Sequence, residues 1–546
     1  MAVVNEFAWW RVHDALQEDD TPVAFAVMGD SNTNQLAGRN DFRETLWSQL
    51  MVLYNRNYGG VLALPWKLGA SGAAVVSSLP ADSINPIRFT SGTLTGDWLG
   101  TTVNPGGFDP ASDLNPLNRE LQSGQTNALV ADPLGLRYEP LALDVDQTIP
   151  EWQISTANKL LDYWRLDGDG SLRGVDVLCR YHHRELPTSI ATSGALTPGW
   201  TPGYRNQNND RGFGPLVSPD SGDDTFRRAF VDFEIPAADN LPTEWMDVYP
   251  SYHQADDPVG PILLDGLSLL IDGVTRPVYE AALLLNMGSQ GAPEYLMALD
   301  GSRSHTYNGT HRIFLEGGDG NTGDANAGRG TPHETGVRYM SMIRDTLGDD
   351  GVLCVIIQGG GNDFDGPAGG SVSSYLGGNV PDPGNWGNPQ NSAHCIAACY
   401  DVLQRWWTDA GGRVDNFCVL HVASFPKPAS DAAADGGDYT PNAALETLNA
   451  TYRETMAPGG QHHRAQLCHV SQVATVEDLW TQGFYADQSG PGYDTAHYTA
   501  AGYAGLGALV AEELQQAGLV GELQGGGGGA RNRARSRARA SRLAQG

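Results

Sequence analysis

Residues 25–33 read Phe-Ala-Val-Met-Gly-Asp-Ser-Asn-Thr, a short apolar run that ends in Gly29-Asp30-Ser31. The run predicts a β-strand over Val23–Met28. An apolar strand that ends at a glycine can hold a serine hydroxyl at the edge of an α/β sheet, where ligands commonly bind. One triplet proves little about chemistry, so its meaning depends on the motifs that occur later in the chain.

The pattern after this strand changes twice. A helix is expected from Asn40 to about Asn55, because apolar residues recur there at helical spacing. From about residue 58 to 277 the chain is rich in Gly, Pro, Asn, Asp and Thr, and short apolar runs between turn signals are typical of an antiparallel sandwich. At Val278–Asn286 an apolar run marks the return of the strand-and-helix pattern seen before residue 58. Further strands are expected at Val352–Gln358, Asn416–Ala423 and Ala465–Val470, and further helices near Ser392–Asp409, Ala443–Thr455 and Tyr498–Ala517.

Strands that alternate with helices predict an α/β fold with a doubly wound parallel sheet, interrupted here by an inserted antiparallel β-sandwich domain. We expect residues 1–57 and 278–521 to form the two parts of the α/β domain and residues 58–277 to form the insertion. Residues 522–546 carry five glycines and then six arginines, which predicts a disordered Gly/Arg-rich tail.

Composition excludes some classes of function. The 546 residues include 64 acidic and 34 basic side chains, a net charge of −30, which disfavours nucleic acid as a partner of the folded body. The sequence has no apolar run of about 18 residues and no basic leader before an apolar one, so neither a membrane span nor a secretory signal is expected. The compartment and the oligomeric state stay open.

Of the six cysteines, Cys354, Cys418 and Cys468 lie in or beside apolar strand-like runs and are expected to be buried free thiols. Cys395 and Cys399 lie four apart beside His394, but further ligands at metal-like spacing are missing. Asp167–Ser171 resembles part of a calcium loop and lacks its acidic twelfth residue, where Leu178 stands. We therefore expect no metal and no cofactor.

Asp494 and His497 are three residues apart near the end of the chain. A serine becomes nucleophilic when a base removes its proton, and the base needs an acid that orients it. We expect the final helix to begin here, so that one helical turn would bring the two side chains to the same side. Asp494 would then orient His497, and His497 would deprotonate Ser31. A capping aspartate beside a surface histidine is the plainer interpretation of this pair alone.

Two glycine-bearing segments come after predicted strands and offer hydrogen-bond donors for an oxyanion. Residues 359–364, Gly-Gly-Gly-Asn-Asp-Phe, place Asn362 at the carboxyl edge of the sheet. Residues 287–292, Met-Gly-Ser-Gln-Gly-Ala, offer the backbone N–H of Gly291, with Gly288 as a near alternative. Residues 359–364 lack the Lys-Ser/Thr ending of a phosphate-binding loop, and a Gly-rich turn without chemistry is the alternative interpretation of them.

The four motifs occur in the order found in SGNH (GDSL-type) hydrolases, and the chain resembles that family over about residues 20–57 and 278–517. The resemblance implies a flavodoxin-like sheet, a catalytic triad of Ser31, His497 and Asp494, and an oxyanion hole formed by Ser31, Gly291 and Asn362. Two features depart from the family: Asn32 replaces the usual leucine, and about 220 residues separate the first helix from the second strand.

Members with a large inserted β domain resemble carbohydrate esterases that remove acetyl groups. The resemblance therefore implies an acylated glycan or another ester as substrate. A lipase or lysophospholipase, and a non-catalytic glycan-binding or particle-associated protein, are the alternatives. The insertion holds five tryptophans that would either stack on sugars or form its core. These are Trp98, Trp152, Trp164, Trp200 and Trp245.

Overall fold

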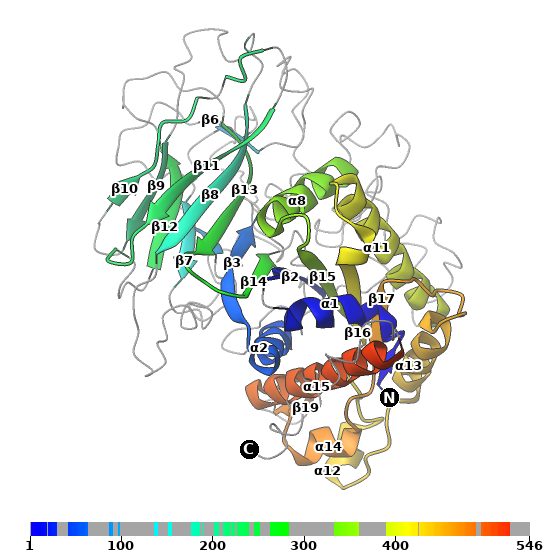
Figure 1. Ribbon diagram of the computed structural model, residues 1–546. Coiled ribbons are helices and arrows are strands. Elements are labelled where there is room, and N and C mark those ends of the chain that lie inside the picture. Colours follow the sequence, from blue (N-terminus) through cyan, green and yellow to red (C-terminus); the bar gives the residue numbers. More distant parts are fainter. Residues whose placement is uncertain are drawn as a thin grey trace.

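The computed structural model describes residues 2–18, 20–29, 42–63, 87–90, 97–98, 136–139, 151–155, 176–185, 188, 201–206, 211–218, 220–223, 227–239, 245–251, 262–282, 332–359, 389–423, 425–487 and 493–524. Within these residues the protein is a mixed α/β structure built on one large sheet (Figure 1).

Six strands of this sheet run parallel, in the order β3-β14-β2-β15-β16-β17. Every residue of β16 and β17 is buried, and both are apolar apart from one histidine each, as is typical of parallel strands covered on both faces. The short strand β1 (Val3–Val4) pairs antiparallel with β17. The six strands are β2 (Val23–Gly29), β3 (Asn57–Ala63), β14 (Pro277–Ala282), β15 (Val352–Gly359), β16 (Phe417–Ala423) and β17 (Leu467–Val470).

The longer helices form two groups around these strands (Figure 1). In the first group, α15 packs against α1 and α2, and α1 also contacts β15, β16 and β17. In the second, α11 packs against α8 and α13, and Tyr452 of α13 contacts His421 of β16. The helices are α1 (Phe7–Gln17), α2 (Phe42–Tyr54), α8 (Pro332–Leu347), α11 (Pro389–Asp409), α12 (Asp431–Asp435), α13 (Ala443–Met456), α14 (Val476–Thr481) and α15 (Ala500–Gln524), with the 3-10 helix η3 (Val414–Asn416).

Antiparallel strands from the middle of the chain extend the large sheet and build a second one. β13 pairs with β3, and β8, β11, β6 and β5 continue from it. The second sheet has the order β10-β9-β12-β7-β4. Tyr204 of the second sheet stacks on Phe233 of the first, with ring centroids 6.5 Å apart. The strands are β4 (Ile87–Thr90), β5 (Asp97–Trp98), β6 (Leu136–Glu139), β7 (Glu151–Ser155), β8 (Val177–Glu185), β9 (Thr201–Asn206), β10 (Arg211–Phe213), β11 (Arg227–Ile235), β12 (Trp245–Ser251) and β13 (Ile262–Ile271).

Strand β3 corrects the expectation that the parallel pattern stops at about residue 58. β3 comes directly after α2 and pairs in parallel with β14. Its two glycines resemble a turn signal, but close packing requires them. A Cβ on Gly59 would lie 2.5 Å from Cβ of Pro277, and one on Gly60, whose φ is +143°, would lie 2.0 Å from the carbonyl oxygen of Leu269.

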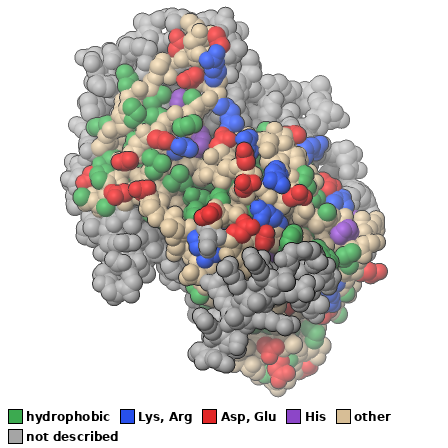
Figure 2. All heavy atoms as spheres, in the orientation of Figure 1, with side chains coloured by type: hydrophobic (Ala, Val, Ile, Leu, Met, Phe, Trp, Pro, Cys, Tyr) green, Lys and Arg blue, Asp and Glu red, His purple; other side chains and the backbone are tan. Residues whose placement is uncertain are grey.

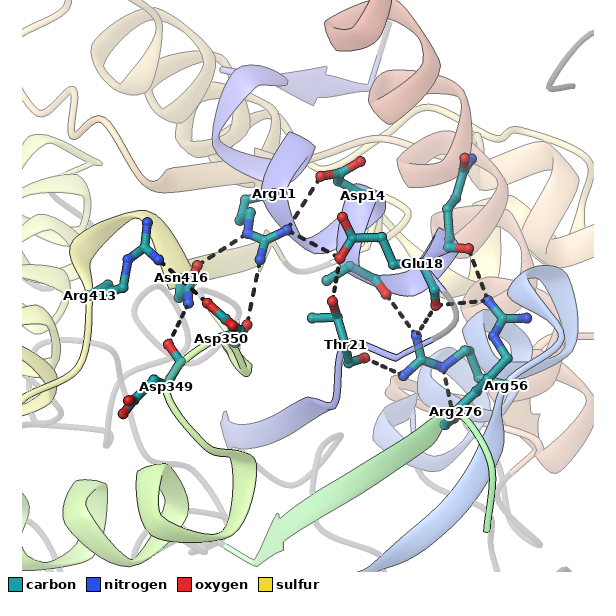
Figure 3. Close-up of polar contacts among 12 residues, drawn as sticks. Arg11, Asp14, Glu18, Thr21, Arg56, Arg276, Asp349, Asp350, Arg413 and Asn416 are labelled. Carbon is teal, nitrogen blue, oxygen red and sulfur yellow. Dashed lines mark hydrogen bonds and ion pairs between the residues drawn. The ribbon is translucent and has the colours of Figure 1, made fainter. Parts of the chain in front are cut away.

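Two arginines, one just before β3 and one just before β14, bind the C-terminal end of α1 (Figure 3). The buried Arg56 donates to the carbonyl oxygens of Ala15 and Thr21 at 2.7 and 2.6 Å. Arg276 donates to the carbonyls of Leu16 and of Asn55, at 2.9 and 3.0 Å. These guanidinium groups satisfy carbonyls that a helix end leaves unpaired, and they hold β2, β3 and β14 in place.

Five cysteines are buried free thiols, which confirms the expectation for Cys354, Cys418 and Cys468. They are Cys179, Cys354, Cys399, Cys418 and Cys468. Cys395 lies in α11, but its side chain is outside the described part, as are the segment Asp167–Ser171 and the tail after residue 524.

Candidate active site

The candidate site lies at the carboxyl edge of three adjacent strands, β14, β2 and β15. Gly29 at the end of β2 pairs with Gln358 near the end of β15, and Ala26 of β2 pairs with Ala281 near the end of β14. Neighbouring strands are about 4.8 Å apart, and parallel strands end at the same edge. The carboxyl ends of these three strands therefore lie side by side.

The segment after each of these three strands carries one of the predicted motifs. Ser31 comes two residues after Gly29, Asn362 three residues after Gly359, and Gly291 nine residues after Ala282 at the end of β14. Ser31, Gly291 and Asn362 themselves lie outside the described residues, so the described part gives the order and direction of the strands that lead to them and not their mutual distances.

The strand order places a switch point beside β2. From β2 the chain goes to β3 and β14 on one side, then crosses to β15, β16 and β17 on the other side. In open α/β sheets such a reversal opens a crevice at the carboxyl ends of the strands, and ligands bind there. Here the crevice is expected between β2 and β15, where the segments that contain Ser31 and Asn362 begin.

Asp494 and His497 lie in a strand, which corrects the expectation of a helical turn. β19 (Tyr493–Tyr498) pairs antiparallel with β18 (Tyr485–Asp487), and α15 begins only at Ala500. Tyr485 is opposite Tyr498, and the next residue of β18 is already opposite Asp494. The register of the pair therefore shifts across residues 495–497, and such irregularities commonly redirect side chains beside active sites. The side chains of Asp494 and His497 are outside the described part.

Buried aromatic rings fix β19 at the carboxyl edge of the sheet. Tyr498, next to His497, has its ring centroid 5.7 Å from that of Phe425 and 5.6 Å from that of Tyr485. The Tyr485 hydroxyl donates to the carbonyl oxygen of Pro426. Phe425 and Pro426 belong to the segment that leaves the carboxyl end of β16, so the backbone of His497 is tied to the edge at which β2 ends.

The start of α15 fixes the other side of His497. The backbone N–H of Gly502 donates to Oγ1 of Thr499 at 3.0 Å, and this hydroxyl donates to the carbonyl oxygen of Gly483 at 3.1 Å. Thr499 is thus the N-cap of the helix. A Cβ on Gly502 would lie 2.4 Å from the carbonyl oxygen of Phe484, so only glycine allows this approach. The sequence pattern did not predict these contacts, because their partners precede β18 and lie outside the motif.

A buried imidazole pair lies near the same edge and was not predicted. His421 of β16 and His469 of β17 are opposite one another, with their Nδ1 atoms 2.9 Å apart and Tyr452 against both rings. Burial, together with the neighbouring His421 and Arg453, holds the pKa of His469 well below its usual range. Both rings are fully buried, so they support the strands and do not reach a substrate.

The described residues contain no group of three or more His, Cys, Asp or Glu side chains that could hold a metal ion. Among them, too, no helix is both long enough and apolar enough to cross a membrane. The assignment of the triad and the oxyanion-hole residues rests on the sequence motifs and on the order of the strands that come before them in the chain.

No protein-family model matches the chain, and no curated protein matches it. Among solved structures, one similar chain is a carbohydrate esterase family 2 enzyme plus carbohydrate binding domain from Corynascus thermopiles (Myceliophthora fergusii), at 13% identity and a TM-score of 0.19, covering 65% of this chain and 97% of that chain. Another is an arabinose-bound MgGH51 α-L-arabinofuranosidase, at 9% identity and a TM-score of 0.23, covering 75% of this chain and 60% of that chain. At such low TM-scores neither similarity carries weight for this chain.

Proposed function

We propose that the chain is a serine ester hydrolase of the SGNH type, with Ser31 as its nucleophile. The order of the parallel strands carries the proposal. If β3 is set aside as the strand that leads into the insertion, β14-β2-β15-β16-β17 is the order 2-1-3-4-5 of a flavodoxin-like, doubly wound sheet. The segments with Ser31, Gly291 and Asn362 leave from the three strands around its switch point.

In the proposed reaction His497 takes the proton from Oγ of Ser31, and this oxygen attacks the ester carbonyl. Asp494 orients the imidazole and stabilises its charged form. The backbone N–H groups of Ser31 and Gly291 and the side-chain amide of Asn362 receive the developing oxyanion. His497 then protonates the leaving alcohol, and water activated by the same imidazole hydrolyses the acyl-enzyme.

The packing of α15 supports the pairing of Ser31 with the C-terminal motif. α15 comes after His497, and it packs against α2, which comes after the segment with Ser31. Two segments that are more than 400 residues apart in the sequence are thus anchored to helices in contact. No cofactor is required for this chemistry.

We further propose that the ester is an O-acetyl group on a polysaccharide and that the segment between β3 and β14 acts as an inserted domain that selects the polymer. The antiparallel strands of this segment support the second part, because they form two sheets in contact through Tyr204 and Phe233. The first of these sheets is continuous with β2, the strand that comes before the proposed nucleophile in the chain.

Acetate release tests the proposal. The protein should release acetate from p-nitrophenyl acetate and from at least one of acetylated xylan, acetylated pectin or acetylated peptidoglycan fragments. Ser31→Ala and His497→Ala should each lose this activity. kcat/KM should fall as the pH drops below ~6.5, where the imidazole base becomes protonated. Activity that increases with acyl-chain length would favour a lipase-type esterase, and no ester hydrolysis by folded protein would refute the proposal.

A further inference from the structure

The outer face of β8 and β11 carries an exposed aromatic ring beside a fixed pair of charges. Phe230 is 60% exposed, although β11 buries Val231, Phe233 and Ile235 on its other face. The guanidinium carbon of Arg180 lies 4.2 Å from the centroid of the Phe230 ring. Arg180 also donates two hydrogen bonds to the carboxylate of Asp232, at 2.7 and 2.8 Å. The ring and the charged pair therefore have defined positions relative to each other.

Three arginines near this ring are each paired with a carboxylate, although the chain as a whole has a net charge of −30. Arg228, on the same face of β11, is 2.8 Å from Asp345 of α8, and Arg227 pairs with Asp223. Figure 2 shows acidic and basic side chains beside one another near the middle of the side of the molecule that it draws, with hydrophobic side chains over the antiparallel strands. With three paired arginines and the exposed Glu234 on the face of Phe230, the surface is close to neutral, which suits a neutral polar polymer better than a polyanion.

The strand register places Phe230 at the same edge of the sheet as the candidate site. Phe230 is opposite His182 of β8, and His182 is opposite Gly266 of β13. Leu267, the residue after Gly266, is opposite Ala63 at the end of β3, and Ala63 is opposite Ala282 of β14. The residue before Ala282 is opposite Ala26 of β2, so this level lies just beyond Ala26. Phe230 is therefore about level with the end of β2, five strand spacings away, or about 24 Å. An extended polymer can span this distance.

We propose that the surface formed by Phe230, Arg180 and Asp232 binds a neutral polysaccharide chain and presents its acyl groups to Ser31. The free face of the Phe230 ring stacks on the C–H face of a sugar, and the outer edges of the Arg180–Asp232 pair exchange hydrogen bonds with hydroxyl groups. This inference rests on the proposed esterase function for its substrate, but the binding itself is measurable without catalysis.

Affinity electrophoresis in gels with soluble acetylated xylan tests the binding, with unacetylated xylan and polygalacturonate as comparison polymers. In the catalytically inactive Ser31→Ala background, acetylated xylan should retard the protein. Phe230→Ala should weaken the apparent affinity by about 2- to 10-fold. Phe213→Ala is the matched control, because Phe213 is 58% exposed but lies on β10 of the second sheet, and it should leave the affinity unchanged. Arg180→Lys, which keeps the charge and loses the planar fork, should weaken binding as well.

The variants also separate this inference from the proposed function. With Ser31 intact, Phe230→Ala should keep the rate on p-nitrophenyl acetate and lose kcat/KM only on the polymer. If the wild-type protein hydrolyses p-nitrophenyl acetate but none of the neutral polymers retards it, the binding surface is refuted and the esterase stands. Equal retardation of the Phe230→Ala and Phe213→Ala proteins, or stronger retardation by polygalacturonate than by xylan, would also overturn the inference.

Discussion

Replacing Arg56 by methionine should strongly destabilise the protein, because its guanidinium donates hydrogen bonds to buried carbonyl oxygens. The side chain is 5% exposed, and its two shortest hydrogen bonds go to the buried carbonyl oxygens of Ala15 and Thr21. An unsatisfied buried polar group costs about 1–3 kcal/mol, so the loss of both bonds costs about 2–6 kcal/mol. A domain is typically stable by about 5–15 kcal/mol, so the change is a large part of the total.

Urea unfolding followed by tryptophan fluorescence measures this loss as a fall in the midpoint at constant slope. Arg276→Met is the matched control, because it removes the second guanidinium from the same helix end. The hydrogen bonds of Arg276 are part-buried or exposed and are 2.9–3.3 Å long, so water can replace it at a cost of about 1 kcal/mol. A loss below about 1 kcal/mol for Arg56→Met, or a larger loss for Arg276→Met, would refute this reasoning.

Two further predictions concern the carboxyl edge of the sheet. Burial lowers the pKa of His469, so its contribution to stability is present above the ordinary value of ~6.5 and is lost as the pH falls below it, at up to about 1.4 kcal/mol per pH unit. Urea midpoints at pH 7.5, 6.5 and 5.5 should show this slope, and His469→Leu should reduce it; an equal slope in both proteins would contradict the prediction. Gly502→Ala should lower kcat/KM on p-nitrophenyl acetate by about 10- to 100-fold, because the added Cβ meets the carbonyl of Phe484 and shifts the strand that carries His497. The exposed neighbour variant Ala501→Ser should keep its activity, and a Gly502→Ala enzyme as active as the Ala501→Ser enzyme would exclude this positioning role.

The parallel core was readable from the sequence because buried strands leave a simple pattern. β15 and β16 are continuous apolar runs, and the structure places them within one residue of the predicted bounds. β3 was missed for the opposite reason, since Gly59 and Gly60 resemble a turn when only the chain is read. Their purpose becomes visible only with Pro277 and Leu269, more than 200 residues away, in contact with them.

The candidate site divides in the same way. The motifs around Ser31 and Asn362 could be identified because each comes after an apolar strand, a local pattern. The sequence pattern predicted a helix start at Asp494 and His497, where the structure has a strand. This strand depends on pairing with β18 and on the contact of Tyr498 with Phe425. The spacing of residues along the chain holds no information on such pairing. The type of secondary structure at β19 is therefore determined by its tertiary contacts.

The central claim is that Ser31 is a nucleophile activated by His497, and covalent labelling tests it most directly. A fluorophosphonate probe should label the folded protein, and peptide mass spectrometry should find the adduct on Ser31. Ser31→Ala should abolish labelling, and His497→Ala should slow it at pH 7.5 while the protein keeps its unfolding midpoint. Folded wild-type protein that takes up no probe, or an adduct on another serine that persists in Ser31→Ala, would contradict the claim.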